Sequence, residues 1–378
     1  MTLLAARCYN VFRMEEISGI ILNVSYPKVG DTSNVEILGK TCGEWVKIAL
    51  SDSYTASVAY NDITPLPQLV GRFLDTSSAY TVILYSDTPL ITKKTILDAV
   101  GHLKDTGKNV LKMTRGYVIR TPYLMRADKI YTEETHYFDE EDFVTAFDFR
   151  QISLITDILK NRILAHHMAA GVQFDDPSTT YIGSDVTIGS GCRIAPNNIF
   201  LGETVIKNNV TVKTGNVVED CIIDDGATLD SSRLYRSYVG KNTSVGPFAY
   251  IRPNCVIGAG CRIGDFVEIK NSVIGDRCKV SHLSYVGDCE MGKGCNIGCG
   301  VVFVNYDGKN KFKTRVGDRV FIGSNSNIIA PLDIESGAFI AAGSTLTQSV
   351  PSGALAIARA RQVNKPEWKG NKFTSDDE

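Results

Sequence analysis

Apolar residues return at every sixth position over most of the second half of the chain. They are Ile182, Ile188, Ile194, Phe200, Ile206, Val212 and Val218, then Val239, Val245, Ile251, Ile257, Ile263 and Ile269, then Ile274, Val280 and Val286, and finally Val316, Ile322, Ile328, Ile334, Ile340 and Leu346. A hexapeptide period of this length predicts a parallel β-helix with triangular coils, in which each apolar residue points into the prism. A β-sandwich would show alternation at every second position and hairpin turns, so the pattern disfavours it.

The period breaks between Gly300 and Val316. The segment NYDGKNKFK (305–313) is polar and carries glycine and lysine, so it cannot continue a coil. We expect it to project from the solenoid as a loop, and loops on rigid scaffolds often carry function.

The first 150 residues have a different pattern. TVILYSD (81–87) is an apolar run that ends at an aspartate, which is typical of a buried strand whose carboxyl end presents Asp87. KKTILDAVGHL (93–103) follows with helical spacing, so we expect an α/β domain. The expected organisation is an α/β domain over 1–150, a linker helix over 151–172, the β-helix over 173–350 and a tail over 351–378, polar and disordered after Trp368.

Composition narrows the class of protein. The 378 residues are 43% hydrophobic and 22% charged, which is typical of a globular protein. The net charge of -2 gives no excess of positive charge with which to bind nucleic acid or a membrane surface. No apolar run reaches transmembrane length, and residues 1–14 do not resemble a signal peptide. The ten cysteines never form a CxxC pair, so we expect reduced core thiols and a cytoplasmic location.

Spacing also brings charged residues together. Three hexapeptides make one coil, so residues eighteen apart should stack in coils about 4.8 Å apart. Arg252 and Lys270 are such a pair, and two cations side by side repel each other. Glu268 could neutralise them, but binding of an anionic ligand such as a phosphate is the more specific interpretation. Ser324 and Ala342 are also eighteen apart, and stacked small residues would leave a groove for an extended ligand.

His282 is the only histidine in the second half of the chain, and Tyr285 follows it closely. A histidine near its ordinary pKa can accept a proton from a nucleophile at neutral pH. A lone histidine is more often structural, and both interpretations stay open at this point.

Several segments in the second half together resemble one family. They are VGPFAYIRPN (245–254), GDFVEIKNS (264–272), SHLSYVGD (281–288), NIG (296–298), NYDGKNKFKT (305–314), FIGS (321–324) and ALAIARARQ (354–362). In order and spacing they resemble the acetyltransferase half of the bifunctional bacterial enzyme N-acetylglucosamine-1-phosphate uridyltransferase / glucosamine-1-phosphate acetyltransferase. The resemblance is dense over roughly 172–368. It implies a left-handed β-helix, a homotrimer with active sites between subunits, acetyl-CoA as co-substrate and an amino-sugar phosphate as acceptor.

The resemblance also assigns roles to individual residues. It implies that His282 is the general base that deprotonates the glucosamine amine. Matching substrate-binding positions are Arg252, Lys270, Tyr285, Asn296 and Lys311, and matching acetyl-CoA-binding positions are Cys299, Asn305, Tyr306, Ser324, Ala342 and Arg359. Cys299 departs from the family, which usually has alanine there. A covalent acetyl-cysteine is conceivable, but direct transfer needs no nucleophile from the protein.

The first half resembles the uridyltransferase domain of the family only in part. GKTCGEWVKIAL (39–50) and YSDTPLI (85–91) match it, with Asp87 at the metal position; AFDFR (146–150) puts Asp148 where asparagine is usual, so Mg²⁺ is implied only if this site is retained. The glycine-rich nucleotide loop is missing, because LAARCYNVFRM (4–14) contains no glycine. We therefore expect a shortened, degenerate nucleotidyltransferase-like domain.

Three hypotheses remain after the sequence. The leading one is acetyl-CoA-dependent N-acetylation of glucosamine 1-phosphate, or a close amino-sugar phosphate, in UDP-N-acetylglucosamine synthesis. The second is retained magnesium-dependent uridylyl transfer to N-acetylglucosamine 1-phosphate. The third is a non-catalytic trimeric scaffold or regulatory paralogue.

Overall fold

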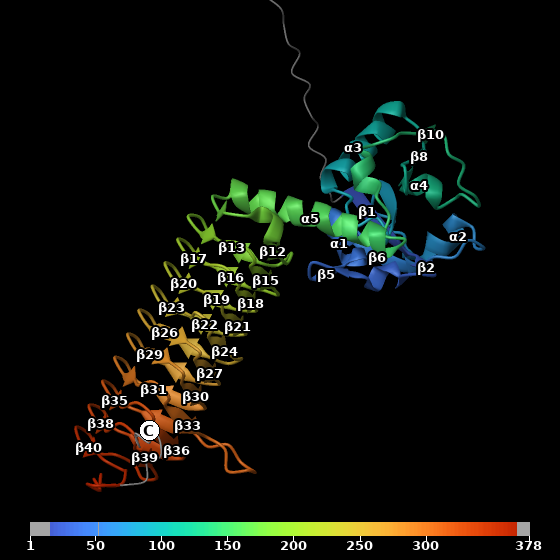
Figure 1. Ribbon diagram of the computed structural model, residues 1–378. Helices are drawn as coiled ribbons and strands as arrows, with labels where there is room; N and C mark the ends of the chain where they lie inside the picture. The colour runs from blue at the N-terminus through green and yellow to red at the C-terminus, as the bar shows by residue number, and fades with distance from the viewer. Residues whose placement is uncertain (1–15, 52, 369–378) are drawn as a thin grey trace, which may run out of the picture. The chain divides into compact units, whose positions relative to one another are not determined.

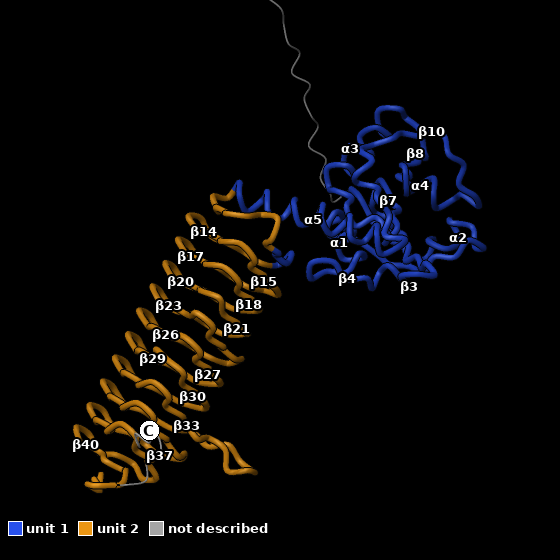
Figure 2. The backbone as a smooth tube through the Cα atoms, viewed as in Figure 1, with its two compact units in different colours: residues 1–169, 181–185 blue, residues 170–180, 186–378 orange. Residues whose placement is uncertain are grey.

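The computed structural model describes residues 16–51 and 53–368, which divide into two compact units (Figures 1 and 2). Unit 1 comprises residues 1–169 and 181–185, and unit 2 comprises residues 170–180 and 186–378. The glycine-free segment 4–14 and the tail after Trp368 lie outside the described residues. Within the described chain, no helix is both long and apolar enough to cross a membrane.

Unit 2 is a parallel β-solenoid of about ten coils, as the hexapeptide period predicted (Figure 1). Each coil places one short strand on each of three sheets, which we call face 1, face 2 and face 3. Face 1 contains β11 (Gln173–Phe174), β14 (Arg193–Ile194), β17 (Thr211–Val212), β20 (Thr228–Leu229), β23 (Ser244–Val245), β26 (Arg262–Asp265), β29 (Lys279–His282), β32 (Asn296–Ile297), β35 (Phe321–Ile322), β38 (Phe339–Ile340) and β40 (Leu355–Ala356). Face 2 in unit 2 contains β15 (Ile199–Leu201), β18 (Val217–Glu219), β21 (Arg233–Tyr235), β24 (Tyr250–Ile251), β27 (Glu268–Lys270), β30 (Tyr285–Gly287), β33 (Val302–Val304), β36 (Asn327–Ile329) and β39 (Thr345–Leu346). Face 3 contains β13 (Thr187–Ile188), β16 (Val205–Ile206), β19 (Ile222–Ile223), β22 (Tyr238–Val239), β25 (Val256–Ile257), β28 (Val273–Ile274), β31 (Cys289–Met291), β34 (Thr314–Val316) and β37 (Leu332–Ile334).

The apolar residues of the six-residue period form the core of this prism. Every one of them is at most 6% exposed, so the predicted inward-facing set is confirmed. Neighbouring strands are parallel, and their backbone groups pair from coil to coil. The left-handed sense of the helix stays a prediction of the family resemblance.

The number of residues per coil varies slightly. Ile251 pairs with Ile269, eighteen residues on, but Ile263 pairs with Val280, seventeen residues on. The shorter coils explain the slips of register in the sequence. The stack also continues into β40, which pairs with β38 and lies beyond the boundary expected at residue 350.

The break in the period is a projecting segment, as predicted, and this segment forms a hairpin. Cys289 of β31 pairs with Thr314 of β34, twenty-five residues on, instead of seventeen or eighteen. The extra residues leave the coil after β33 as a hairpin (Figure 1). Within it, Tyr306 and Lys311 form an antiparallel β-bridge, and the Phe312 amide donates a hydrogen bond to the Asn305 carbonyl at 2.8 Å.

Unit 1 is built on a mixed six-stranded sheet in the order β10-β8-β9-β7-β1-β6. Its strands are β1 (Ile17–Asn23), β6 (Tyr54–Ala59), β7 (Tyr80–Tyr85), β8 (Val110–Lys112), β9 (Tyr117–Arg120) and β10 (Glu134–Thr135). Short pairs are formed by β2 (Ser25–Tyr26) with β3 (Gly30–Asp31) and by β4 (Glu36–Ile37) with β5 (Lys40–Thr41), and β12 (Tyr181–Ile182) also falls in this unit. Helices are α1 (Cys42–Ala49), α2 (Leu66–Val70), α3 (Lys93–Thr106), α4 (Thr121–Leu124) and α5 (Phe149–Ala169). The predicted strand is β7 and the predicted helix is α3, so the expected α/β class is confirmed.

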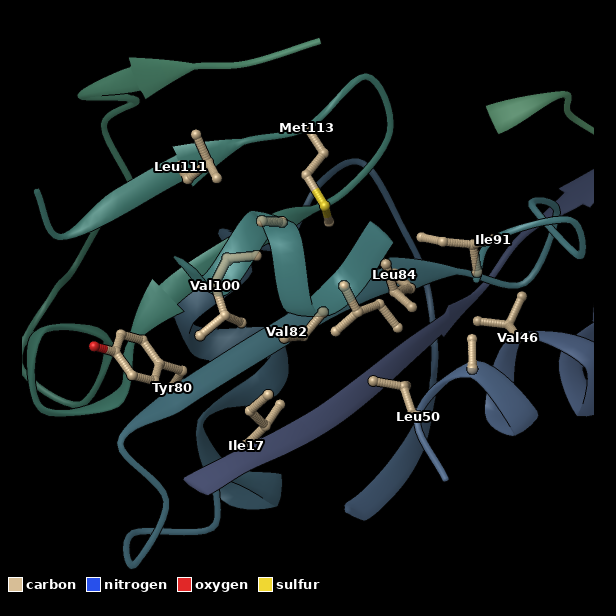
Figure 3. Packing of buried hydrophobic residues seen from close by; sticks show 14 of the residues in the cluster. Ile17, Val46, Leu50, Tyr80, Val82, Leu84, Ile91, Val100, Leu111 and Met113 are labelled. Carbon is tan, nitrogen blue, oxygen red and sulfur yellow. The ribbon is translucent and has the colours of Figure 1, made fainter. Parts of the chain in front are cut away.

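Both sides of β7, an inner strand of this sheet, are buried. Val82 and Leu84 of β7 pack with α1 and α3 on one side (Figure 3), while Ile83 packs with α2 and α4 on the other. Such two-sided burial explains why β7 reads as a continuous apolar run. The helix expected over 151–172 is α5, which begins at Phe149 and clusters with unit 1.

Two adjacent isoleucines on β19 allow a test of which side chains point into the core of the prism. Ile223 is fully buried, whereas Ile222 points outward and is 42% exposed. We expect Ile223→Ala to lower the free energy of unfolding by about 2–5 kcal/mol, because it leaves a cavity in the prism. Ile222→Ala is the matched control and should cost less than about 1 kcal/mol. Denaturant unfolding followed by circular dichroism measures both, and equal losses would contradict the assigned inward face.

Candidate functional site

His282 lies in an Asp–His pair at the end of face 1. Asp265 ends β26, His282 ends β29, and the two residues are directly paired across the ladder. Their side chains meet at 2.5 Å between Oδ1 of Asp265 and Nδ1 of His282. The hydrogen bond with His282 lowers the pKa of Asp265, so the carboxyl is ionised at neutral pH. An ionised carboxylate only accepts hydrogen bonds, so Nδ1 carries the hydrogen and the neutral ring keeps its lone pair on Nε2.

The pair begins a column at the corner that follows face 1. Its members each lie two residues after an inward-facing residue, and they are Asp265, His282, Cys299, Ser324 and Ala342. Backbone hydrogen bonds link successive corners: the Asn325 amide donates to the Cys299 carbonyl and the Gly343 amide to the Ser324 carbonyl, each at 2.8 Å. We call this set the corner column. The Arg359 side chain lies beside Gly343, at the far end of the column.

Cys299 differs from the other cysteines that the structure describes. It is partly exposed, whereas the rest are buried. Cys261, Cys278 and Cys295 occupy another corner, where each thiol donates to a backbone carbonyl at 3.0–3.1 Å. All three are buried, as expected for core thiols.

A cluster of basic residues lies on face 2. Arg252 directly follows β24 and Lys270 ends β27, and the Ile251–Ile269 pair puts the two basic residues at corresponding places, as the eighteen-residue spacing predicted. Nη1 of Arg252 lies 2.9 Å from Oε1 of Glu268, the predicted neutralising acid. The neighbouring Lys270 ammonium lowers the pKa of Lys311, and the Arg252 charge adds to this effect. The hairpin lysine therefore belongs to the same cluster. We call Arg252, Lys270 and Lys311 the basic cluster.

Asp288 organises the polar residues around the basic cluster. Its carboxylate lies 3.5 Å from Nζ of Lys270, accepts a hydrogen bond from Nδ2 of Asn271 at 2.5 Å and accepts another from Nδ2 of Asn305. Burial raises the pKa of Asp288, but these hydrogen bonds and the Lys270 charge outweigh it and lower the pKa. Asn305 also lies 3.4 Å from the Tyr285 hydroxyl, so the start of the hairpin is fixed beside face 2.

The predicted residues therefore form two groups around one corner. Only Leu283 and Ser284 separate His282 from β30, which carries Tyr285 and lies next to the basic cluster. Asn296 lies instead on the outward side of β32 in face 1, and Tyr306 lies on the hairpin with its hydroxyl donating to the Gly308 carbonyl.

Two carboxylates of this site were missed by the sequence reasoning. Asp265 and Asp288 both fall inside the segments that carry the family resemblance. An offset of seventeen from His282 would have found Asp265, and an offset of eighteen from Lys270 would have found Asp288.

The predicted metal residues lie in unit 1 and are held by other partners. Asp87 is fully buried and forms a double contact with the guanidinium of Arg115. Asp148 accepts a hydrogen bond from the Gln151 amide at 2.9 Å and so caps α5. Among the described residues, no group of three or more His, Cys, Asp or Glu could hold a metal ion. The residues present do not fit Mg²⁺.

The tautomer of His282 can be measured directly. We expect protonated Nδ1 and unprotonated Nε2 in the neutral ring, because the Asp265 carboxylate accepts the Nδ1 hydrogen. Long-range ¹H–¹⁵N correlation spectra should show this state, with His282→Gln used to assign the signals. In Asp265→Asn the preference should weaken toward a mixture of tautomers. A wild-type ring protonated on Nε2 would contradict the pair.

Comparisons with known proteins agree with the sequence motifs. Residues 233–306 match the family model described as the GMPPB C-terminal domain. The bifunctional protein GlmU of Clostridium novyi is 52% identical over 222 residues, which are 59% of this chain and 49% of that protein. GlmU of Clostridium beijerinckii is 46% identical over 277 residues, or 73% of this chain and 56% of that protein. The chain thus spans about half the length of the curated relatives it matches.

Solved structures give weaker matches. A mutant of perosamine N-acetyltransferase from Caulobacter crescentus, in complex with CoA and GDP-perosamine, is 25% identical with a TM-score of 0.28 over 31% of this chain and 53% of that one. LpxA from Moraxella catarrhalis is 17% identical with a TM-score of 0.25 over 50% of this chain and 69% of that one. Among these comparisons, the strongest similarity of this chain is to the bifunctional GlmU proteins, over 222 to 277 of its residues.

Proposed function

We propose that the solenoid catalyses acetyl-CoA-dependent N-acetylation of glucosamine 1-phosphate, or of a close amino-sugar phosphate. The observation that carries this proposal is the Asp265–His282 pair, one corner away from the basic cluster. A base and an anion-binding group at that spacing suit a small substrate that carries an amine and a phosphate.

The basic cluster binds the phosphate in this mechanism. Arg252 offers a planar donor pair and Lys270 a point charge, while Glu268 and Asp288 hold both side chains in place. Tyr285 lies beside them, with its hydroxyl 3.4 Å from Asn305, and can contact the sugar hydroxyls. The substrate amine then faces the corner that follows face 1.

His282 accepts the proton that the amine releases. Nε2 is the basic nitrogen, and the Asp265 carboxylate stabilises the imidazolium that forms. The amine attacks the acetyl thioester, the C–S bond breaks and coenzyme A leaves as a thiolate that takes up a proton. Direct transfer requires no thioester on Cys299, although that thiol lies one coil beyond His282.

The corner column supplies the groove for acetyl-CoA. Ser324 and Ala342 have small side chains in register, which leaves room along the column for an extended ligand. Arg359 lies at its far end and can pair with a phosphate of the coenzyme. Tyr306, on the hairpin, can cover the ligand from the side.

We propose that the protein acts as a homotrimer. Phe248, Phe266 and Leu283 are 57–58% exposed at successive turns of the same corner, and the rings of Phe248 and Phe266 stack at 5.4 Å. An apolar ridge of this kind favours burial by a second copy. Asn296 lies on face 1, whereas Lys270 lies on face 2. A substrate that contacts both residues is therefore more easily bound between two subunits, with one residue from each.

We infer that uridylyl transfer has been lost from unit 1 and that the protein works in the cytoplasm. The first inference is supported by the glycine-free segment 4–14 and by the engagement of Asp87 with Arg115. The second is supported by the buried cysteines of the solenoid core, which form no disulfides among the described residues.

A thiol-release assay with acetyl-CoA and glucosamine 1-phosphate tests the proposal. Release should require the sugar, and His282→Ala should lower the rate by about 10²–10⁴-fold because the base is removed. His166→Ala, which removes an exposed histidine of α5, is the control and should leave the rate unchanged. No release from folded, trimeric protein would overturn the proposal and favour another acceptor or a scaffold.

Lys270→Ala tests the phosphate site. Loss of a charge-assisted hydrogen bond should weaken sugar-phosphate binding by about 1.5–3 kcal/mol, seen as a raised KM for the sugar. Asp288 keeps its contacts with Asn271 and Asn305, so the local structure should persist. Lys279→Ala, at an exposed position of β29, is the matched control. An unchanged KM for Lys270→Ala would place the phosphate elsewhere.

A further inference from the structure

The Asp87 carboxylate is the most deeply buried charge among the residues discussed so far. It follows β7 and has no exposed surface. Its backbone carbonyl accepts a hydrogen bond from the Ala146 amide at 2.8 Å, which brings the segment that leads to Asp148 to the same edge of the sheet. A buried carboxylate is costly unless a cation and hydrogen bonds compensate its charge.

Arg115 supplies that cation with a two-point contact. Its Nε donates to Oδ1 of Asp87 at 2.7 Å, and its Nη2 lies 2.6 Å from Oδ2. The Tyr26 hydroxyl donates to the same Oδ2 at 2.5 Å. Burial and this hydrogen bond raise the pKa of Tyr26 to about 12, so the hydroxyl remains a donor at neutral pH. Both carboxylate oxygens are therefore occupied.

The local fold holds Arg115 in this position. The guanidinium also lies over the Tyr85 ring, with Cζ 4.2 Å from the centroid. The turn between β8 and β9 passes so close to β7 that a Cβ on Gly116, at φ +121°, would lie 2.5 Å from the Ile83 carbonyl oxygen. Only glycine fits there, and it sets the tight turn that aims Arg115 at Asp87.

We propose that Arg115 is the permanent counter-ion of Asp87, that it takes the place a divalent cation would have, and that unit 1 depends on this ion pair for its stability. Mg²⁺ needs carboxylate oxygens free for near-octahedral coordination, and Asp87 offers none. Asp148 cannot compensate, because its side chain caps α5 and lies 3.5 Å from Arg150. Arginine keeps its proton at any physiological pH, so the pairing does not switch.

Mn²⁺ binding by the full-length chain tests the first part. Mn²⁺ is a spectroscopic substitute for Mg²⁺, and electron paramagnetic resonance counts the free ion. We expect wild type and Asp87→Asn to leave the same amount of Mn²⁺ free at millimolar concentrations. Stoichiometric binding by wild type that Asp87→Asn abolishes would overturn the proposal.

Thermal unfolding tests the second part. Trp45 of α1 donates to the Ile37 carbonyl in the core of unit 1, and the other tryptophan, Trp368, is 70% exposed, so fluorescence reports on this unit. Arg115→Met leaves an unpaired buried carboxylate and should lower the midpoint by roughly 10 °C. The matched control, Arg126→Met, removes an exposed arginine and should change it little.

A double variant keeps the test decisive if Arg115→Met does not fold. Asp87→Asn combined with Arg115→Met removes both charges and should recover most of the lost stability. An unchanged midpoint in Arg115→Met, or no recovery in the double variant, would overturn the dependence on the pair. Thiol release by the solenoid is read separately, so failure of this proposal and failure of the acetyl-transfer proposal are distinguishable.

Discussion

Parallel pairing between successive coils is the constraint on which the candidate site depends. Each strand is fixed to the next by backbone hydrogen bonds at a spacing of about 4.8 Å, and the buried aliphatic residue in each strand fixes its register. A fixed register converts a distance of seventeen residues along the chain into direct contact, which is how Asp265 meets His282. A one-residue slip of β29 would turn Val280 out of the core, so the core enforces the geometry of the pair.

The same constraint explains why the solenoid tolerates an insertion beside the site. The hairpin leaves the stack after β33, and the chain resumes at β34 with its inward-facing Val316 still buried. The hairpin adds no core, so its residues are free to be polar. Asn305 anchors its base through Asp288 and Tyr285, and Lys311 returns to the basic cluster. A rigid scaffold thus positions a loop whose base is held by polar contacts.

The sequence predicted the features that repeat and missed the contacts that depend on local coil length. The six-residue period identified the buried residues, and a step of eighteen paired Arg252 with Lys270 correctly. The same step taken back from His282 reaches Gly264, because this coil has seventeen residues; the true partner is Asp265. In unit 1, the apolar run and its terminal Asp87 were evident, but Arg115 was not. Its approach depends on a turn between two later strands, and no periodic spacing records such a contact.

Each unit contains an aspartate paired with a basic side chain, and the two pairs differ in burial and in the identity of the partner. Asp265 is partly exposed and pairs with the imidazole of His282, a type of side chain that can act as a general base, so we propose that this pair takes part in proton transfer. Asp87 is buried and holds a guanidinium, which does not titrate, so this pair can only neutralise charge and stabilise the fold. The identity of the partner, together with its access to water, decides whether the same carboxylate supports chemistry. By this argument a role in proton transfer is proposed for the pair in the solenoid, and a role in stability for the pair in unit 1.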